Sequence, residues 1–300
     1  MHAPRTQPHG FEADDMAGRR CGAWGSVGRR WGTHRALRWP SLVLCLGACR
    51  SVLAFEIFDG FHIHGFLSQG YFFTSDNNLF GSSERGGSLD FTEIGVNASW
   101  LPLPNLQLAA QLLSRRAGEG EGHEGEIELD FGLADYTAVA TADRRLGVRL
   151  GRVRLPFGIY NETRDVAFTR PSILLPQSIY FERTRELALS GDGAMFFGEQ
   201  RSPWGNFVLE LGPFLPRVDN QDTELAVFGL EPPGDLESRW SFIGRLKYET
   251  PGERLLLAVT GVHLEIGYGP RFSPPDDFGP GTETFDPVIY SAQYKAEHCS

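Results

Sequence analysis

The sequence has no long apolar run and almost no lysine. Its longest uncharged apolar stretch extends from Trp39 to Cys49, whereas a membrane-spanning helix needs about 20 residues. This excludes a helical membrane protein, but a β-barrel, whose strands are short and only alternately apolar, stays compatible with the composition. Lysine occurs only at Lys247 and Lys295, and the 300 residues have a formal net charge of −10. A nucleic-acid-binding surface and a disordered chain are therefore not expected.

Cysteine is equally scarce where a fold would need it. Cys21, Cys45 and Cys49 lie in the first 54 residues, which leaves Cys299 alone in the rest of the chain. An exported domain with a single cysteine cannot be stapled by internal disulfides. We therefore expect its stability to come from an extensive hydrogen-bonded architecture.

Residues 1–54 have the composition of an export signal. An arginine-rich start precedes the apolar run 42–48, and the small-residue end Val52-Leu53-Ala54 follows. This order is typical of a secretory signal peptide. It predicts cleavage after Ala54 and divides the chain into a leader, 1–54, and an acidic remainder, 55–300.

Two other interpretations of the leader stay open. Leu46-Gly47-Ala48-Cys49 is similar to a bacterial lipoprotein box, in which Cys49 would be lipidated. The apolar run could also be incidental. A signal peptide or a lipoprotein signal would export the chain, whereas an incidental run would not. Of the three interpretations we prefer the signal peptide.

From Phe61 onward, apolar and other residues alternate with a period of two, which is the pattern of β-strands. In 93–100, for example, Ile94, Val96, Ala98 and Trp100 alternate with more polar or smaller residues. No long stretch has helical periodicity. The pattern predicts ten strands, at 61–73, 89–100, 106–116, 126–139, 146–155, 187–199, 204–212, 240–249, 254–266 and 286–297.

The connections between these strands alternate strictly in length. The long ones are 74–88, 117–125, 156–186, 213–239 and 267–285, and the short ones are 101–105, 140–145, 200–203 and 250–253. A soluble β-sandwich has no reason to alternate in this way, because both of its ends face the same water. Outer-membrane barrels do, because their periplasmic turns are short and their external loops are long.

The fold class that follows is an all-β, transmembrane, antiparallel up-and-down β-barrel. Hydrocarbon cannot hydrogen-bond a free strand edge, so spanning strands must close on themselves. Small residues on the expected inner face, such as Gly95 and Ala109, leave room for water. Aromatic residues near strand ends, such as Trp100 and Trp240, suit the two membrane interfaces.

One stretch carries a family resemblance. Leu150-Gly-Arg-Val-Arg-Leu-Pro-Phe-Gly158, followed by Tyr160-Asn-Glu-Thr-Arg-Asp165, resembles the porin O/P-like superfamily of proteobacterial outer-membrane porins, in particular an uncharacterised porin-like group. The resemblance is specific over 146–200 and diffuse elsewhere. It implies a water-filled pore in the bacterial outer membrane for passive diffusion of small hydrophilic solutes. It also implies that the third long loop, 156–186, folds inward and narrows the channel.

The same resemblance implies the partners. These are outer-membrane lipid, lipopolysaccharide and small hydrophilic solutes, with a homotrimer as the assembly to test; nucleic acid, a metal and a cofactor are not expected. Such porins end in a strand whose last residue is aromatic, but this chain ends Glu297-His-Cys-Ser300. We therefore expect a barrel that is incomplete at the C-terminus through truncation or a frameshift.

An arginine-rich stretch crosses the expected constriction. Because the planar guanidinium can bind two oxygens of a carboxylate or phosphate at once, arginines lining a narrow pore would attract anions. The alternative is that they pair with acids of the barrel wall or bind lipopolysaccharide at the rim. The candidates are Arg149, Arg152, Arg154, Arg164, Arg170, Arg183 and Arg185.

Other features point away from catalysis. The glycine- and glutamate-rich stretch 118–126 is interpreted as a flexible acidic external loop, and His62 and His64 as polar residues that line the lumen rather than ligands. No nucleotide-binding, metalloprotease or nucleophile-elbow motif occurs. We expect no enzyme, while a barrel-embedded lipid hydrolase and a soluble or lipid-anchored exported β-protein stay open as alternatives.

Overall fold

A computed structural model of the 300-residue chain describes 53–78, 80–117, 125–166, 169–172, 174–182, 184–218, 223–224, 234–270 and 280–296. Most of the expected leader, 1–54, lies outside these residues. The first strand begins at Leu53, so the expected cleavage point after Ala54 falls inside that strand. The acidic loop expected at 118–126 also lies largely outside the described ranges.

The described part of the chain is built mainly of strands. Its short helical elements are η1 (Ser83–Arg85), η2 (Asn161–Thr163) and α1 (Arg185–Leu189). None of these described helices has the length and apolar character needed to cross a membrane. The strands are β1 (Leu53–Phe58), β2 (Phe61–Gln69), β3 (Phe91–Leu103), β4 (Leu106–Ala117), β5 (Ile127–Ala140), β6 (Arg144–Arg154), β7 (Ser190–Ser202), β8 (Gly205–Pro216), β9 (Gly234–Ser238), β10 (Ser241–Glu249), β11 (Leu255–Pro270), β12 (Gly281–Phe285) and β13 (Val288–Tyr294).

The strands form one antiparallel, up-and-down sheet in the order β1-β2-β3-β4-β5-β6-β7-β8-β10-β11. Strand β13 pairs with the first half of β11, whereas β9 and β12 flank its second half. Within the described residues β1 and β13 are not paired with each other, so the sheet is not closed. The all-β, up-and-down prediction is confirmed, and closure into a barrel stays a prediction.

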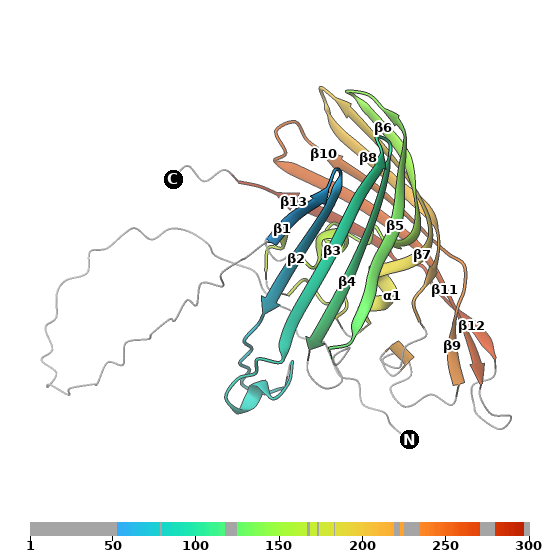
Figure 1. Ribbon diagram of the computed structural model, residues 1–300. Coiled ribbons are helices and arrows are strands. Elements are labelled where there is room, and N and C mark those ends of the chain that lie inside the picture. The colour runs from blue at the N-terminus through green and yellow to red at the C-terminus, as the bar shows by residue number, and fades with distance from the viewer. Residues whose placement is uncertain are drawn as a thin grey trace, which may run out of the picture. The chain divides into compact units, whose positions relative to one another are not determined.

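Each of the ten predicted strands is present, as β2 to β8, β10, β11 and β13. The tight turns 59–60, 104–105, 141–143 and 203–204 gather at one end of the sheet, at the top of Figure 1, and the long connections leave from the other end. The alternation of long and short connections therefore corresponds to the two ends of one sheet.

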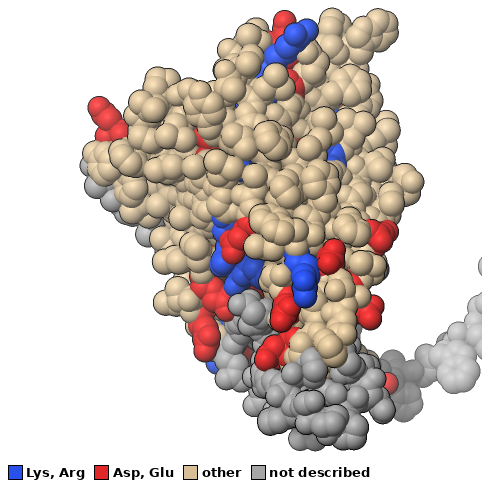
Figure 2. Space-filling view, turned by 90° about the vertical axis from the view of Figure 1, so that its right-hand side faces the viewer, with Lys and Arg blue, Asp and Glu red and all other residues tan. Residues whose placement is uncertain are grey.

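The two faces of the sheet have an unusual polarity. Several charged side chains in the middle of the strands are buried, among them Glu93, Arg115, Asp130, Glu210 and Arg245. Figure 2 shows a broad outer surface almost free of charged side chains, with Lys, Arg, Asp and Glu gathered mainly near the end of the long connections. Away from the strand ends, the large exposed side chains of the long strands are mostly apolar, including Leu67, Ile94, Val96, Leu108, Leu112, Leu146, Leu150, Phe196, Leu209, Phe242, Leu246, Leu257 and Val259.

Candidate functional site

The connection between β6 and β7, residues 155–189, packs against the inner face of the sheet; we call it the inner segment. It includes η2 and α1, and α1 is drawn within the curve of the sheet in Figure 1. The hydroxyl of Thr260 on β11 donates to the carbonyl of Pro156 at 3.2 Å. On the opposite side, Arg115 of β4 donates to the Glu182 carboxylate at 2.6 Å. The segment is thus attached to two separate parts of the wall.

The chain turns inward at Pro156-Phe157-Gly158. Gly158 has a positive φ of 65°, which favours glycine, and a Cβ there would lie 2.3 Å from the Tyr180 hydroxyl. That hydroxyl accepts hydrogen bonds from the backbone N–H groups of Ile159 and Tyr160 at 2.9 and 3.0 Å. Burial raises the pKa of Tyr180. The proline-phenylalanine-glycine motif therefore fixes how the segment enters the interior.

Asn161 holds the two ends of the inner segment together. Its fully buried side-chain amide donates to the carbonyls of Leu155 and Ala188, at 2.9 and 2.8 Å, and more weakly to that of Leu189 at 3.2 Å. Leu155 begins the segment and Leu189 ends it. The Asn161 amide thus adds a donor to carbonyls at both ends of the segment, beside the backbone N–H groups of Phe157 and Leu155, which donate to Leu155 and Leu189.

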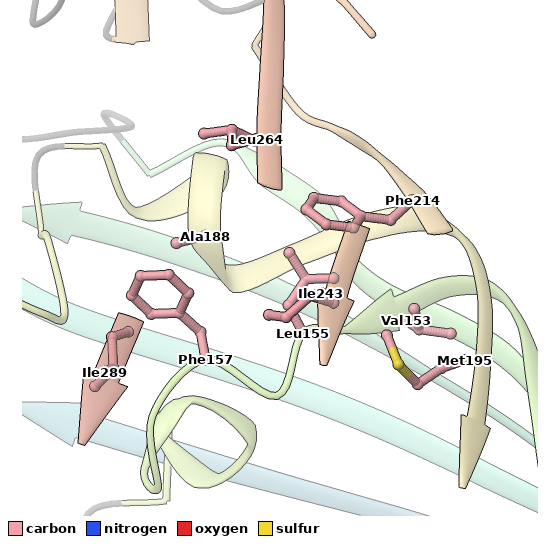
Figure 3. Close-up of a cluster of buried hydrophobic side chains, with 9 residues drawn as sticks. All are labelled: Val153, Leu155, Phe157, Ala188, Met195, Phe214, Ile243, Leu264 and Ile289. Carbon is pink, nitrogen blue, oxygen red and sulfur yellow. The ribbon is translucent and has the colours of Figure 1, made fainter. Parts of the chain in front are cut away.

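An apolar cluster attaches one side of the segment to β7, β8, β10, β11 and β13. Figure 3 shows Phe157 and Ala188 of the segment lying among side chains of these strands. Burying such side chains contributes about 1.5–3 kcal/mol each. This part of the inner face is packed rather than filled with water. The members are Val153, Leu155, Phe157, Ala188, Met195, Phe214, Ile243, Leu264 and Ile289.

A buried ionic cluster attaches the other side to β3, β4, β5 and β6. Arg115 pairs with Glu93 at 3.2 Å as well as with Glu182, and Arg164 also pairs with Glu182, at 2.7 Å. Arg154 donates to both Asp130 and Asp165, and Gln111 bridges the same two carboxylates at 2.9 and 3.1 Å. Arg185 pairs with Asp165 and approaches Glu93 at 3.9 Å. Every arginine of this cluster has a buried carboxylate partner.

The carboxylates that the inner segment brings to this cluster are held ionised. Burial disfavours the charged form of Asp165, but Arg185 and Arg154 outweigh it and hold its pKa well below its usual range. Glu182 follows the same logic: burial is outweighed by Arg164 and Arg115, and its pKa is lowered. These ion pairs therefore persist at neutral pH.

A second ionic group lies on β5, β6, β8 and β10. Arg149 donates to Asp135 at 3.0 Å and to Glu210 at 3.1 Å. Arg245 pairs with Glu210 and with Glu162 of the inner segment. Burial opposes the charge on Glu162, but Arg245 and then Arg149 lower its pKa. The segment is thus anchored by charge on two sides and by apolar packing on one.

The candidate arginines separate into four groups. Arg154, Arg164 and Arg185 meet in the first ionic cluster, and Arg149 lies in the second. Arg152 forms a two-point contact with its neighbour Asp192 on β7, at 2.8 and 3.0 Å, apart from both clusters. Arg170 is half-buried, and its Nε has no hydrogen-bond partner among the described residues. Arg183 lies outside them. Pairing with wall acids, the alternative interpretation, accounts for most of these side chains.

Several residues that share the ionic clusters with these arginines, or that hold the inner segment in place, were not predicted from the sequence. They are Glu93, Gln111, Arg115, Asp130, Asn161, Glu210 and Arg245. The available signal is an isolated charged or amide residue at an inward position of an otherwise apolar strand, since such a residue needs a buried partner. That signal identifies the residues but not which ones pair.

The chemistry that this arrangement offers is that of fixed charges. Among the described residues, no group of three or more His, Cys, Asp or Glu could hold a metal ion. A cavity of about 30 Å³ beside α1, lined in part by Arg115, Arg185 and Arg217, has room for ordered water only. No family model, curated protein or solved structure matches the chain. A functional assignment therefore depends on the geometry of the sheet and the inner segment.

Proposed function

We propose that the chain is a bacterial outer-membrane β-barrel of the porin type, which lets small hydrophilic solutes diffuse passively. The observation that carries this proposal is the polarity of the sheet: apolar side chains cover the outside, while Glu93, Glu210 and Arg245 are buried inside. Paired charges can be buried in any fold, so the exterior carries the argument: a continuous apolar outer face on the strands is what lipid requires. In this proposal the long connections are external and the tight turns periplasmic.

The inner segment supports a narrow rather than an open lumen. It occupies the interior and is attached to β3–β6 through ionic pairs and to β7–β13 through the apolar cluster. Because Arg164 and Arg185 of the segment, like Arg154 of β6, are balanced by carboxylates, their charge is largely cancelled within about 4 Å. We therefore propose weak charge selectivity in place of the strong anion preference that an unpaired arginine lining would produce.

Planar-bilayer conductance tests this function. The purified chain, refolded in detergent and added to a lipid bilayer, is expected to produce discrete conductance steps and a reversal potential near zero in a KCl gradient. Swelling of proteoliposomes in sugars of increasing size would give the solute cut-off. A matched control is Leu209→Arg, which places a charge on the exposed side of β8 and should reduce insertion. Folded protein that binds lipid but gives no steps would overturn the porin assignment.

A further inference from the structure

Two histidines on β2 stand next to each other on the inner face. His62 and His64 alternate with exposed or outward residues such as Leu67 of the same strand. On β3, His62 pairs in register with Ser99 and His64 with Asn97. The residues that alternate with these two, Val96 and Trp100, are exposed on the outer face. The face that they share is therefore the one on which Glu93 meets Arg115.

The two imidazole rings lie side by side, with their planes roughly stacked. Their centres lie 6.4 Å apart and the ring planes differ by 27°. Two imidazoles bound to one ion through nitrogens about 2.0–2.1 Å from it have ring centres about 4.5–5 Å apart at ligand angles of about 90–110°. Both side chains must therefore rotate to turn a nitrogen toward a common ion, a motion that leaves the strand backbone in place.

Neither ring is engaged by the rest of the protein. Both histidines are half-buried, yet across the described ranges no hydrogen bond or ion pair is made by either ring. Histidines with a structural role have a partner: His263, for example, contacts Asp286 at 2.6 Å. Half-buried polar groups usually find partners, and imidazole is the commonest metal ligand.

Although the sequence favoured a lumen-lining role over a ligand role for this pair, we propose that His62 and His64 bind a divalent transition-metal ion on the inner face of the sheet, with water completing its coordination. Two imidazoles favour Cu²⁺ over Ni²⁺ and Zn²⁺, following the general order of affinities. Ca²⁺ and Mg²⁺, which need oxygen ligands, are not expected to bind. The site requires the folded sheet but not conduction, so it is independent of the proposed channel function.

Copper titration of the detergent-refolded full chain tests the site, with CuSO₄ as the probe. Isothermal titration and electron paramagnetic resonance of the wild type are expected to reveal a site with two nitrogen ligands. His62→Gln or His64→Gln should weaken this site at least 10-fold, and the double variant should abolish it. The matched control His263→Gln should leave it unchanged. Sites elsewhere are common to all variants, so only the difference between variants is interpreted.

A second measurement does not depend on how the variants fold. In the wild type, Cu²⁺ should protect His62 and His64 from diethylpyrocarbonate, read by mass spectrometry, while His263 stays reactive. Equal modification of His62 and His64 with and without Cu²⁺ would overturn the proposal. So would a folded double variant that binds Cu²⁺ as the wild type does.

Discussion

The guanidinium of Arg245, on β10, donates a hydrogen bond of 2.8 Å to the backbone carbonyl of Gly158, at the inward turn of the inner segment. The same side chain pairs with Glu162 of the segment and with Glu210 of β8. One buried arginine therefore joins two strands of the wall to the start of the segment that fills the interior. The buried charge of Arg245 therefore anchors the inner segment to the sheet.

Replacing Arg245 by leucine should be strongly destabilising. Glu210 and Glu162 would lose their partner in a buried setting, and breaking a buried pair from one side costs about 3–5 kcal/mol. Arg201→Ala is the matched control, because the Arg201 side chain is 65% exposed and its pair with Glu199 is a surface pair worth about 0–1 kcal/mol. Urea unfolding in detergent micelles measures both; equal effects would contradict the anchoring role.

Arg152 and Arg154, two positions apart on β6, should behave differently. Arg154→Ala would leave the buried Asp130 without its paired cation and Asp165 with Arg185 as its one remaining described partner cation, for a loss of about 3 kcal/mol. Arg152→Ala removes a pair whose partner Asp192 is 52% exposed, for a loss below about 1 kcal/mol. The comparison uses the midpoint of unfolding. A larger effect at Arg152 would show that the inner cluster is not the stabilising one.

Asn161→Leu should release the inner segment. The carbonyl of Ala188 would lose its side-chain donor, while that of Leu155 would keep only the N–H of Phe157, at a cost of about 1–3 kcal/mol. If the segment narrows a channel, single-channel conductance should rise. Asn206→Leu is the control, since Asn206 makes only one side-chain bond, at 3.2 Å to Glu199. Unchanged conductance in Asn161→Leu, with the protein folded, would argue against a constricting role.

Acid should loosen the segment only well below neutral pH. The pKa values of Glu162, Asp165 and Glu182 are lowered in the folded state, so the stability they provide is complete above the ordinary carboxyl value of about 4 and is lost as the pH falls below it. Hydrogen–deuterium exchange of 155–189, corrected for the intrinsic rate, should show constant protection from pH 7 to pH 5 and a loss below pH 4. Loss of protection between pH 7 and pH 5 would contradict the sign of these shifts.

The sequence predicted the long strands because their alternation is strong, as in 93–100 and 241–249, where every second residue is apolar and outward. It did not predict β1, which begins inside the expected leader, and it also missed the two short strands β9 and β12. These strands have five residues each, and every described residue of β12 is exposed. Strands of that length carry too little alternation to detect, and they form because the long strand β11 offers them an edge.

The sequence located the arginine-rich stretch but did not predict which acids pair with its arginines. The arginine-rich stretch does fall on the inner segment and on β6, but its charges are cancelled by Glu93, Asp130 and Glu210, which lie far away in the sequence. Which acid meets which arginine depends on the depth at which the segment enters the sheet. Local sequence patterns carry no information on that depth.

The polarity of β3 offers the most direct test of the whole account. Single cysteines at Val96, Ala98, Asn97 and Ser99, in a chain whose native cysteines are replaced by serine, can be probed after reconstitution into vesicles. Gly95 is left intact, because a side chain there would collide with Phe66. The account predicts alternation: labels at 96 and 98 are quenched by lipid-attached nitroxides, while 97 and 99 react with a water-soluble thiol reagent. Equal reactivity with water at all four positions would contradict it.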